Sequence, residues 1–176
     1  IDPNAEELPA GTRLKTRAGR RLRVADFLGA GNEGSVYRAD LNGETVALKL
    51  FKRDATGQRK KRSRALVDLG LSQVFASQIA APFDVAEWEG RSVHVAALAR
   101  GISVQELIDQ PQALSPRQRV MATIRLGSIL CRLHACGYAY GDLNKGAVKC
   151  EVLGPNSVRV TLVDVDSLVI PGFSLP

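Results

Sequence analysis

The stretch Gly29-Ala30-Gly31-Asn32-Glu33-Gly34 places three glycines between two runs of β-forming residues. After the last glycine, Ser35-Val36-Tyr37 continues as a strand, whereas the same spacing in a dinucleotide-binding fold would open a helix. We interpret the stretch as the tip of a β hairpin whose bare backbone can approach triphosphate oxygens. A glycine-rich hairpin can equally be only a turn, so the loop alone does not decide between the two.

A single lysine in an apolar strand helps to interpret the glycine loop. The run Val46-Ala47-Leu48-Lys49 contains one cationic side chain, and a lysine buried there needs an anionic partner. The alternative is a surface lysine on an edge strand. Taken together with the glycine loop, Lys49 favours a site for the phosphates of a nucleotide.

The first half of the chain has the pattern of an antiparallel sheet with one helix. Three short β-rich runs broken by glycine predict three strands, at 22–28, 34–40 and 45–51. The pair Asn42-Gly43 predicts a tight hairpin between the second and third. One amphipathic helix follows over 58–71, with a solvated basic turn at 59–64. Two further strands are predicted at 82–86 and 92–97, with a turn between them at 88–90. A link follows at 99–103.

The second half predicts a long helix and a hairpin. Ser115 and Pro116 are typical of a helix start, as cap and first helical residue. Apolar residues then recur at helical spacing up to Gly137, which predicts one long, largely buried helix. A hairpin follows over 148–163. These patterns predict the α+β fold class. We divide the chain into an N-terminal extension (1–20), a small β-rich lobe with one helix (21–98), and a link with a helical lobe (99–176).

Carboxylates follow the long helix and the last strand. Asp142 lies in the loop Tyr140-Gly141-Asp142-Leu143-Asn144, and two more carboxylates lie in Val163-Asp164-Val165-Asp166-Ser167. Acidic residues at such ends can hold Mg²⁺ and orient an attacking hydroxyl. Ordinary turn chemistry would explain any one of them alone, because aspartate is common in loops.

In this order, the loop, the lysine and the two aspartate segments resemble the motif set of protein kinases. More narrowly, Pro82-Phe83-Asp84-Val85 and the two aspartate segments resemble bacterial kinases found with tellurite-resistance-type von Willebrand A proteins and metal-dependent phosphatases. The resemblance covers about 21–170. It implies a protein-kinase-like fold whose helical C-lobe is truncated, because the chain ends soon after Asp164.

The resemblance also implies roles. Lys49 would contact the α- and β-phosphates of ATP, Asp142 would accept the proton of a substrate hydroxyl, and Asp164 would hold Mg²⁺. The other residues that it assigns to the nucleotide are Gly29, Gly31, Gly34, Val36 and Ala47. The implied activity is transfer of the γ-phosphoryl group to Ser or Thr of a protein. The implied partners are a protein substrate or a regulatory protein, with a von Willebrand A protein and a metal-dependent phosphatase as candidates.

The chain departs from the kinase pattern in two places. Kinases pair the strand lysine with a glutamate on the following helix, but 58–71 contains no glutamate and Asp68 is its one acidic residue. The second metal ligand, an asparagine in kinases, corresponds to Ala147. These departures favour the alternative of a pseudokinase that senses nucleotide or docks partners, whereas Lys49, Asp142 and Asp164 favour a transferase with low or conditional activity.

Charge and cysteine usage bound the remaining possibilities. The 176 residues are 45% hydrophobic and carry a formal charge of +6, which favours phosphate-bearing or acidic partners. A function in nucleic acid binding through the arginine-rich stretches is less well supported, because no aromatic residues are interleaved with the arginines. The three cysteines have no metal-ligand spacing, which indicates free thiols in a reducing compartment. No apolar run approaches the roughly twenty residues of a membrane span, and we expect a cytoplasmic protein.

Overall fold

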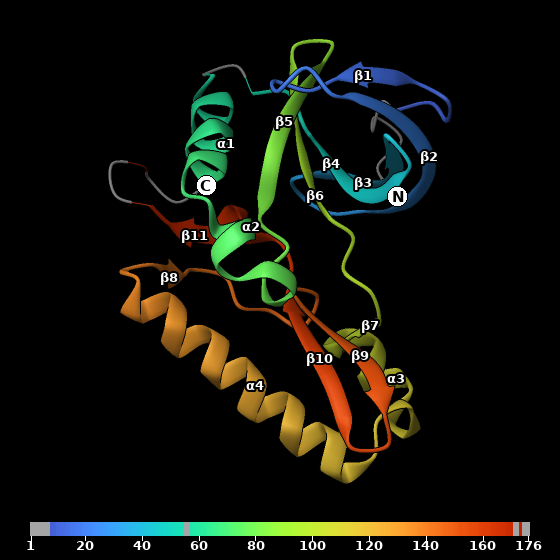
Figure 1. Ribbon diagram of the computed structural model, residues 1–176, viewed down its shortest axis with the longest axis vertical. Coiled ribbons are helices and arrows are strands. Elements are labelled where there is room, and N and C mark those ends of the chain that lie inside the picture. Colours follow the sequence, from blue (N-terminus) through green and yellow to red (C-terminus); the bar gives the residue numbers. More distant parts are fainter. Residues whose placement is uncertain (1–7, 55–56, 171–172, 174–176) are drawn as a thin grey trace. The chain divides into compact units, whose positions relative to one another are not determined.

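The computed structural model describes residues 8–54, 57–170 and 173, and Figure 1 shows its elements. The chain falls into two units. The first consists of Ile1–Val74 and Ala81–Leu98, and the second of Phe75–Ala80 and Ala99–Pro176.

An antiparallel six-stranded sheet forms the first unit, in the order β1-β2-β3-β4-β6-β5. Its strands are β1 Arg13–Lys15, β2 Arg21–Ala30, β3 Gly34–Leu41, β4 Glu44–Phe51, β5 Pro82–Trp88 and β6 Arg91–Ala97. All five predicted strands of this region are present. The hairpin between β3 and β4 turns through Asn42 and Gly43 at φ 54° and 91°, so the predicted Asn-Gly turn is confirmed.

One face of this sheet carries the hydrophobic core of the first unit. Leu48 and Leu50 of β4 are fully buried, together with Val93 and Val95 of β6. The core also takes in Leu8 and Leu14, and β1 pairs with β2. Part of the stretch 1–20 therefore belongs to this sheet, although three residues of β1 are too few to give a strand pattern in the sequence.

The buried carboxylate of Asp84 in β5 ties the turn between β1 and β2 to the sheet. Arg20 donates to its Oδ2 from Nη2 at 2.8 Å and from Nε at 3.2 Å, and the backbone N–H of Ala18 donates to Oδ1 at 3.4 Å. Burial alone would raise the pKa of Asp84, but hydrogen bonds from Thr16, Arg20 and two backbone N–H groups together hold that pKa below its ordinary value. Asp84 is thus a structural residue of the first unit.

The predicted helix is present but shorter and less solvated than expected. Helix α1 spans Gln58–Asp68, and a separate turn, α2, spans Leu71–Val74. Gly70 lies between them in the left-handed region at φ 65°, a conformation that ends helices. The basic turn is not wholly solvated, because α1 packs on β5 and β6 and thereby buries Arg62.

The second unit combines one long helix with small sheets. Its helices are η1 Ala76–Gln78, α3 Val104–Asp109, η2 Pro111–Ala113, α4 Pro116–Ala135 and η3 Val165–Ser167. Its strands are β7 Ile102–Ser103, β8 Ala139–Tyr140, β9 Val148–Gly154, β10 Ser157–Leu162 and β11 Leu168–Val169. The predicted hairpin is formed by β9 and β10, which join β7, while β8 pairs with β11.

Helix α4 begins as predicted but is not largely buried. Ser115 and Gln118 form a capping box, and Pro116 is the first helical residue. The side chains of Val120 and Ile124, however, are 61% and 66% exposed. One face of the helix packs on β10 and β8, and no other described helix or strand covers the opposite face extensively. Within the described part of the chain, no helix is long and apolar enough to cross a membrane.

Candidate functional site

The glycine loop is the closed tip of the hairpin between β2 and β3. The backbone N–H of Gly31 donates to the carbonyl oxygen of Gly34 at 2.9 Å. The N–H of Lys52, just beyond β4, donates to the carbonyl oxygen of Glu33 at 2.9 Å. The loop therefore continues the sheet rather than opening a helix, as the sequence predicted.

The three glycines of the loop stand in different surroundings. A Cβ on Gly34 would lie 2.1 Å from the carbonyl oxygen of Leu50, because β3 and β4 approach closely there. At Gly29 and Gly31 a Cβ would meet nothing within 4 Å, and neither residue has a positive φ. Packing requires glycine only at Gly34, so the other two leave an accessible backbone surface.

The sheet register places the other predicted nucleotide residues beside one another. Gly29 of β2 pairs with Val36 of β3, which in turn pairs with Lys49 of β4. Ala47 lies two residues before Lys49 and so on the same face of β4, the face opposite Leu48. Since β4 lies between β3 and β6, the alternative of a lysine on an edge strand is wrong.

Lys49 pairs with a carboxylate of the glycine loop. Its Nζ lies 3.2 Å from Oε2 of Glu33, and the two side chains are only 18% and 30% exposed. Arg59 of α1 approaches the same carboxylate, with Nη2 3.6 Å from Oε1. Nζ of Lys49 lies 5.1 Å from the centre of the Phe51 ring, and Cζ of Arg59 lies 4.7 Å from it. Two cations thus converge on one carboxylate above an aromatic ring.

The carboxylate that pairs with Lys49 comes from the glycine loop and not from helix α1. The acidic residue of α1, Asp68, lies at the end of the helix and pairs with Arg17 at 3.4 Å, where both side chains are more than half exposed. Neither Glu33 nor Arg59 was predicted from the sequence, because the kinase pattern places the carboxylate on the helix. The signal for Glu33 was a carboxylate inside the glycine loop itself.

In the second unit, Asn144 shapes the loop that carries Asp142. Oδ1 of Asn144 accepts hydrogen bonds from the N–H groups of Gly146 at 2.9 Å and Ala147 at 3.1 Å. Its Nδ2 donates to Oδ2 of Asp142 at 3.2 Å. Asn144 therefore fixes the backbone of this loop and orients the Asp142 carboxylate.

Backbone pairing ties the two aspartate segments together. Strand β8 precedes Asp142 and pairs with β11, and the N–H of Gly141 donates to the carbonyl oxygen of Ser167 at 2.9 Å. The hydroxyl of Tyr140 donates to the carbonyl oxygen of Val163 and, at 3.0 Å, to that of Asp164. Burial and the nearby charge of Asp164 raise the pKa of Tyr140, so this hydroxyl stays protonated and remains a donor.

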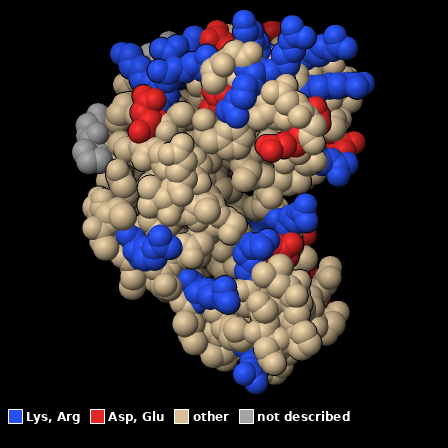
Figure 2. All heavy atoms as spheres, viewed as in Figure 1, with Lys and Arg blue, Asp and Glu red and all other residues tan. Residues whose placement is uncertain are grey.

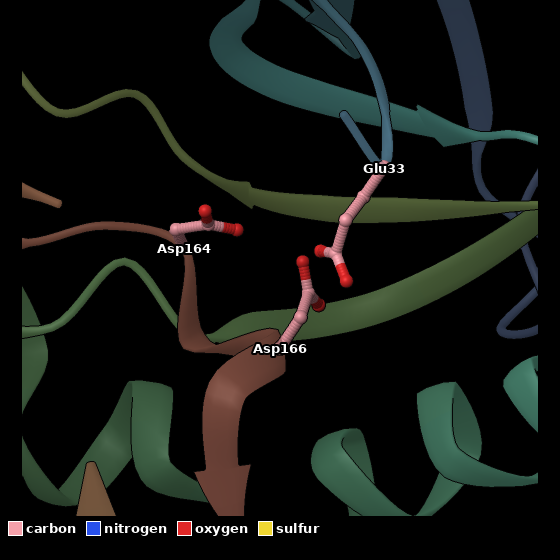
Figure 3. Close-up of side chains that lie close together, drawn as sticks. All are labelled: Glu33, Asp164 and Asp166. Atoms are coloured by element: carbon pink, nitrogen blue, oxygen red, sulfur yellow. The ribbon is translucent and has the colours of Figure 1, made fainter. Parts of the chain in front are cut away.

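Asp164 and Asp166 form a pair of carboxylates on one segment. Asp164 adopts the left-handed conformation at φ 65° and ψ 47°, which is strained for most residues but tolerated by aspartate. One carboxylate oxygen of each lies within 4.8 Å of the other, and Figure 3 shows both side chains on the segment around η3. Paired carboxylate oxygens fit Mg²⁺. The sequence assigned only Asp164, although Asp166 follows two residues later.

At the position where kinases have an asparagine as second metal ligand, this chain has a buried alanine. Ala147 is 1% exposed. Its N–H bonds to Asn144, and its carbonyl oxygen accepts from the N–H of Val163 at 2.8 Å. The backbone here joins the Asp142 loop to the end of β10, and the side chain supplies no ligand atom.

Comparisons with known proteins identify the fold. No family model matches the chain, and no curated protein sequence does. Solved structures match in large number, 1599 chains, which marks a widespread architecture. One is the structure of vaccinia related kinase 3, with a TM-score of 0.66, 21% identity, and coverage of 94% of this chain and 53% of that chain. The chain thus spans about half the length of that kinase.

The chain has a protein-kinase-like α+β fold, as the sequence predicted. The first unit is an antiparallel β-rich lobe with α1, and the second unit is a small lobe with α4 as its long helix. At 21% identity the likeness establishes the fold alone.

Proposed function

We propose that the chain is an ATP-binding kinase-like domain that transfers the γ-phosphoryl group of ATP to a Ser or Thr hydroxyl of a protein. The observation that carries this proposal is the pairing of Lys49 with Glu33. A lysine inside a central strand, held by a carboxylate beside an open glycine backbone, is what a phosphate-binding lysine requires.

Each group has a role in the proposed transfer. Lys49 and the accessible backbone at Gly29 and Gly31 bind the phosphates. Asp142, oriented by Asn144, accepts the proton as the substrate oxygen bonds to the γ-phosphorus and the bond to the β-phosphate oxygen breaks, releasing ADP. Mg²⁺, when bound, neutralises charge on the transferring group. Asp164 and Asp166 would hold it.

A second candidate is a pseudokinase that binds nucleotide and docks partners without efficient transfer. Ala147 favours it, since a buried methyl group replaces the second metal ligand and leaves fewer groups to neutralise the transferring phosphoryl. Under this candidate the Lys49 region keeps its affinity for ATP.

One experiment separates these possibilities. The chain is titrated with Mg-ATP while its melting temperature is recorded, and transfer of labelled γ-phosphate to the chain or an added protein is then measured. A melting shift with transfer supports the kinase, whereas a shift without transfer supports the pseudokinase. A folded chain whose melting curve does not move at millimolar Mg-ATP would show that the nucleotide site is wrongly assigned.

We further propose a cytoplasmic chain that acts on, or is regulated by, other proteins. A von Willebrand A protein and a metal-dependent phosphatase are the partners that the kinase resemblance suggests. The location rests on the cysteines: Cys131, Cys136 and Cys150 all carry free thiols, as is usual in a reducing compartment.

A further inference from the structure

A second group of basic side chains surrounds a cavity in the first unit. The cavity has a volume of about 230 Å³ and is lined by residues at β1, α1, β5 and β6. Its cations are Lys15 and Arg17 beside β1, and Lys60 and Arg64 on α1. No residue of the glycine loop or of β4 lines it. Figure 2 shows Lys and Arg side chains gathered over the end of the first unit that carries β1 and the turn between β5 and β6.

The charges around this cavity are unbalanced. Glu87 is the one carboxylate of the lining, and it pairs with Lys60. Arg17 pairs outside the lining, with Asp68. Among the described residues, Lys15 and Arg64 take part in no ion pair. Two positive charges therefore remain uncompensated at one cavity, which favours an anion of charge about −2.

The size and lining of the cavity narrow the class of anion. At about 230 Å³ it is smaller than the roughly 300 to 1,000 Å³ of pockets for drug-sized ligands, so it suits one small group better than a whole nucleotide. Arg17 and Arg64 offer planar forks that suit phosphate oxygens. Val85 and Ala86 give buried apolar contacts for the carbon atoms of a side chain. The hydroxyls of Thr16 and Ser92 also lie in the lining, but they are engaged with Asp84 and Ser63.

We propose that this cavity binds a phosphate group, either as the free ion or as the phosphomonoester of a phosphorylated serine or threonine side chain. Its charge matches the two uncompensated cations, and the cavity has room for it. The site is separate from the proposed nucleotide site and does not depend on it. A single-stranded nucleic acid fits less well, because the lining contains no aromatic residue on which a base could stack.

The test uses the whole chain and three ligands, with binding followed by calorimetry. The ligands are inorganic phosphate, a neutral peptide that contains one phosphoserine, and the same peptide with serine. We expect the first two to bind and the serine peptide not to bind. A tighter phosphopeptide identifies a protein-borne group as the ligand, and equal affinities identify the free anion.

Three variants locate the bound phosphate. Arg64→Gln should weaken binding about tenfold or more, since it removes a charge-assisted contact. Lys61→Gln, on the same helix but outside the lining, should leave binding unchanged. Lys49→Met should also leave it unchanged, and this separates the cavity from the nucleotide site. Trp88 fluorescence and circular dichroism check that each variant is folded.

Several results would overturn the proposal. Absence of binding at millimolar phosphate and phosphopeptide is one. Binding lost in Lys49→Met but kept in Arg64→Gln would place the phosphate at the glycine loop. Equal losses in Arg64→Gln and Lys61→Gln, or tighter binding of a single-stranded oligonucleotide, would indicate diffuse charge attraction instead of a site.

Discussion

The glycine-loop region of the first unit and the aspartate segments of the second are held in place by different forces. In the first, side-chain charges hold one another: Glu33 lies between Lys49 and Arg59. In the second, hydrogen bonds to the backbone fix the carboxylates, through Asn144 and Tyr140. The first region should therefore respond to changes of charge, and the second to changes of backbone geometry.

The largest effect is expected at Gly34 of the first region, where close packing of β3 on β4 leaves no room for a side chain. Gly34→Ala would place a methyl group 2.1 Å from the Leu50 carbonyl oxygen, so we expect a loss of about 3 kcal/mol in unfolding free energy. Gly31→Ala meets nothing within 4 Å and is the matched control, with a change within about 0.5 kcal/mol. Urea unfolding followed by Trp88, the one tryptophan, reports on this unit. Equal losses in both variants would contradict the assignment.

Lys49 tests whether the charge of the first region binds phosphate. We expect Lys49→Met to weaken Mg-ATP binding about 10- to 100-fold, because a charge-assisted hydrogen bond contributes roughly 1.5 to 3 kcal/mol. Lys61→Met removes an exposed lysine of α1 and should leave the affinity unchanged. Calorimetric titration measures both. Similar losses in the two variants would mean that ATP is attracted by overall charge.

A variant at Asp164 tests whether the carboxylate of the second region holds Mg²⁺. Asp164→Asn removes the charge but tolerates the left-handed backbone, so we expect the chain to stay folded while the Mg²⁺-dependent part of the ATP affinity falls about tenfold. Asp109→Asn at the end of α3 is the control. Titrations with Mg²⁺ and with a chelator separate the metal-dependent part. An unchanged magnesium dependence would remove Asp164 from the metal site.

Glu33 sharpens the comparison, because it affects the orientation of Lys49 without removing its charge. We expect Glu33→Gln to lower kcat severalfold to tenfold while the affinity for ATP changes less, since phosphoryl transfer needs the lysine held in place. Steady-state assays with the variant and the wild type give both quantities. If ATP binds much more tightly to the variant, Glu33 is instead a competitor of the phosphates.

The smallest effect concerns pH and the buried carboxylate of Asp84. Its pKa lies below the ordinary 3.8, so its contribution is complete above that value and is lost as the pH falls through the folded-state pKa. We expect Asp84→Asn to cost about 1 kcal/mol at pH 7, since Arg20 is partly solvent-exposed, and the difference from wild type to shrink toward pH 3. Urea unfolding at both pH values measures it. A constant difference would contradict the assignment.

The sequence predicted most of the fold because its signals are local. Strand alternation, the Asn-Gly turn and the Ser115-Pro116 helix start each involve neighbouring residues, and each is present. Strand β1 was not predicted, since three residues carry too little pattern. The burial of α4 was overestimated, because helical spacing shows which face is apolar but not whether another element covers it.

The candidate site was predicted only as far as residue types at fixed spacing allow. The sequence predicted that Lys49 lies within a strand and that Asp164 lies at the end of one. It could not predict the partner of Lys49, which depends on the position of the glycine loop relative to β4. Glu33 and Arg59 come from a loop and a helix whose meeting is a tertiary event. Ala147 could be recognised as a missing ligand, whereas its burial could not.

The pair of Lys49 with Glu33 also has a consequence for how the domain could be controlled. In kinases the lysine's carboxylate comes from a mobile helix, and repositioning that helix switches the enzyme. Here lysine and carboxylate are 16 residues apart within one stretch of consecutive antiparallel strands. Closing so short a loop costs little chain entropy, so the pair forms with the sheet itself. Displacing α1 would remove the Arg59 contact to Glu33 but would leave the pair of Lys49 with Glu33 in place.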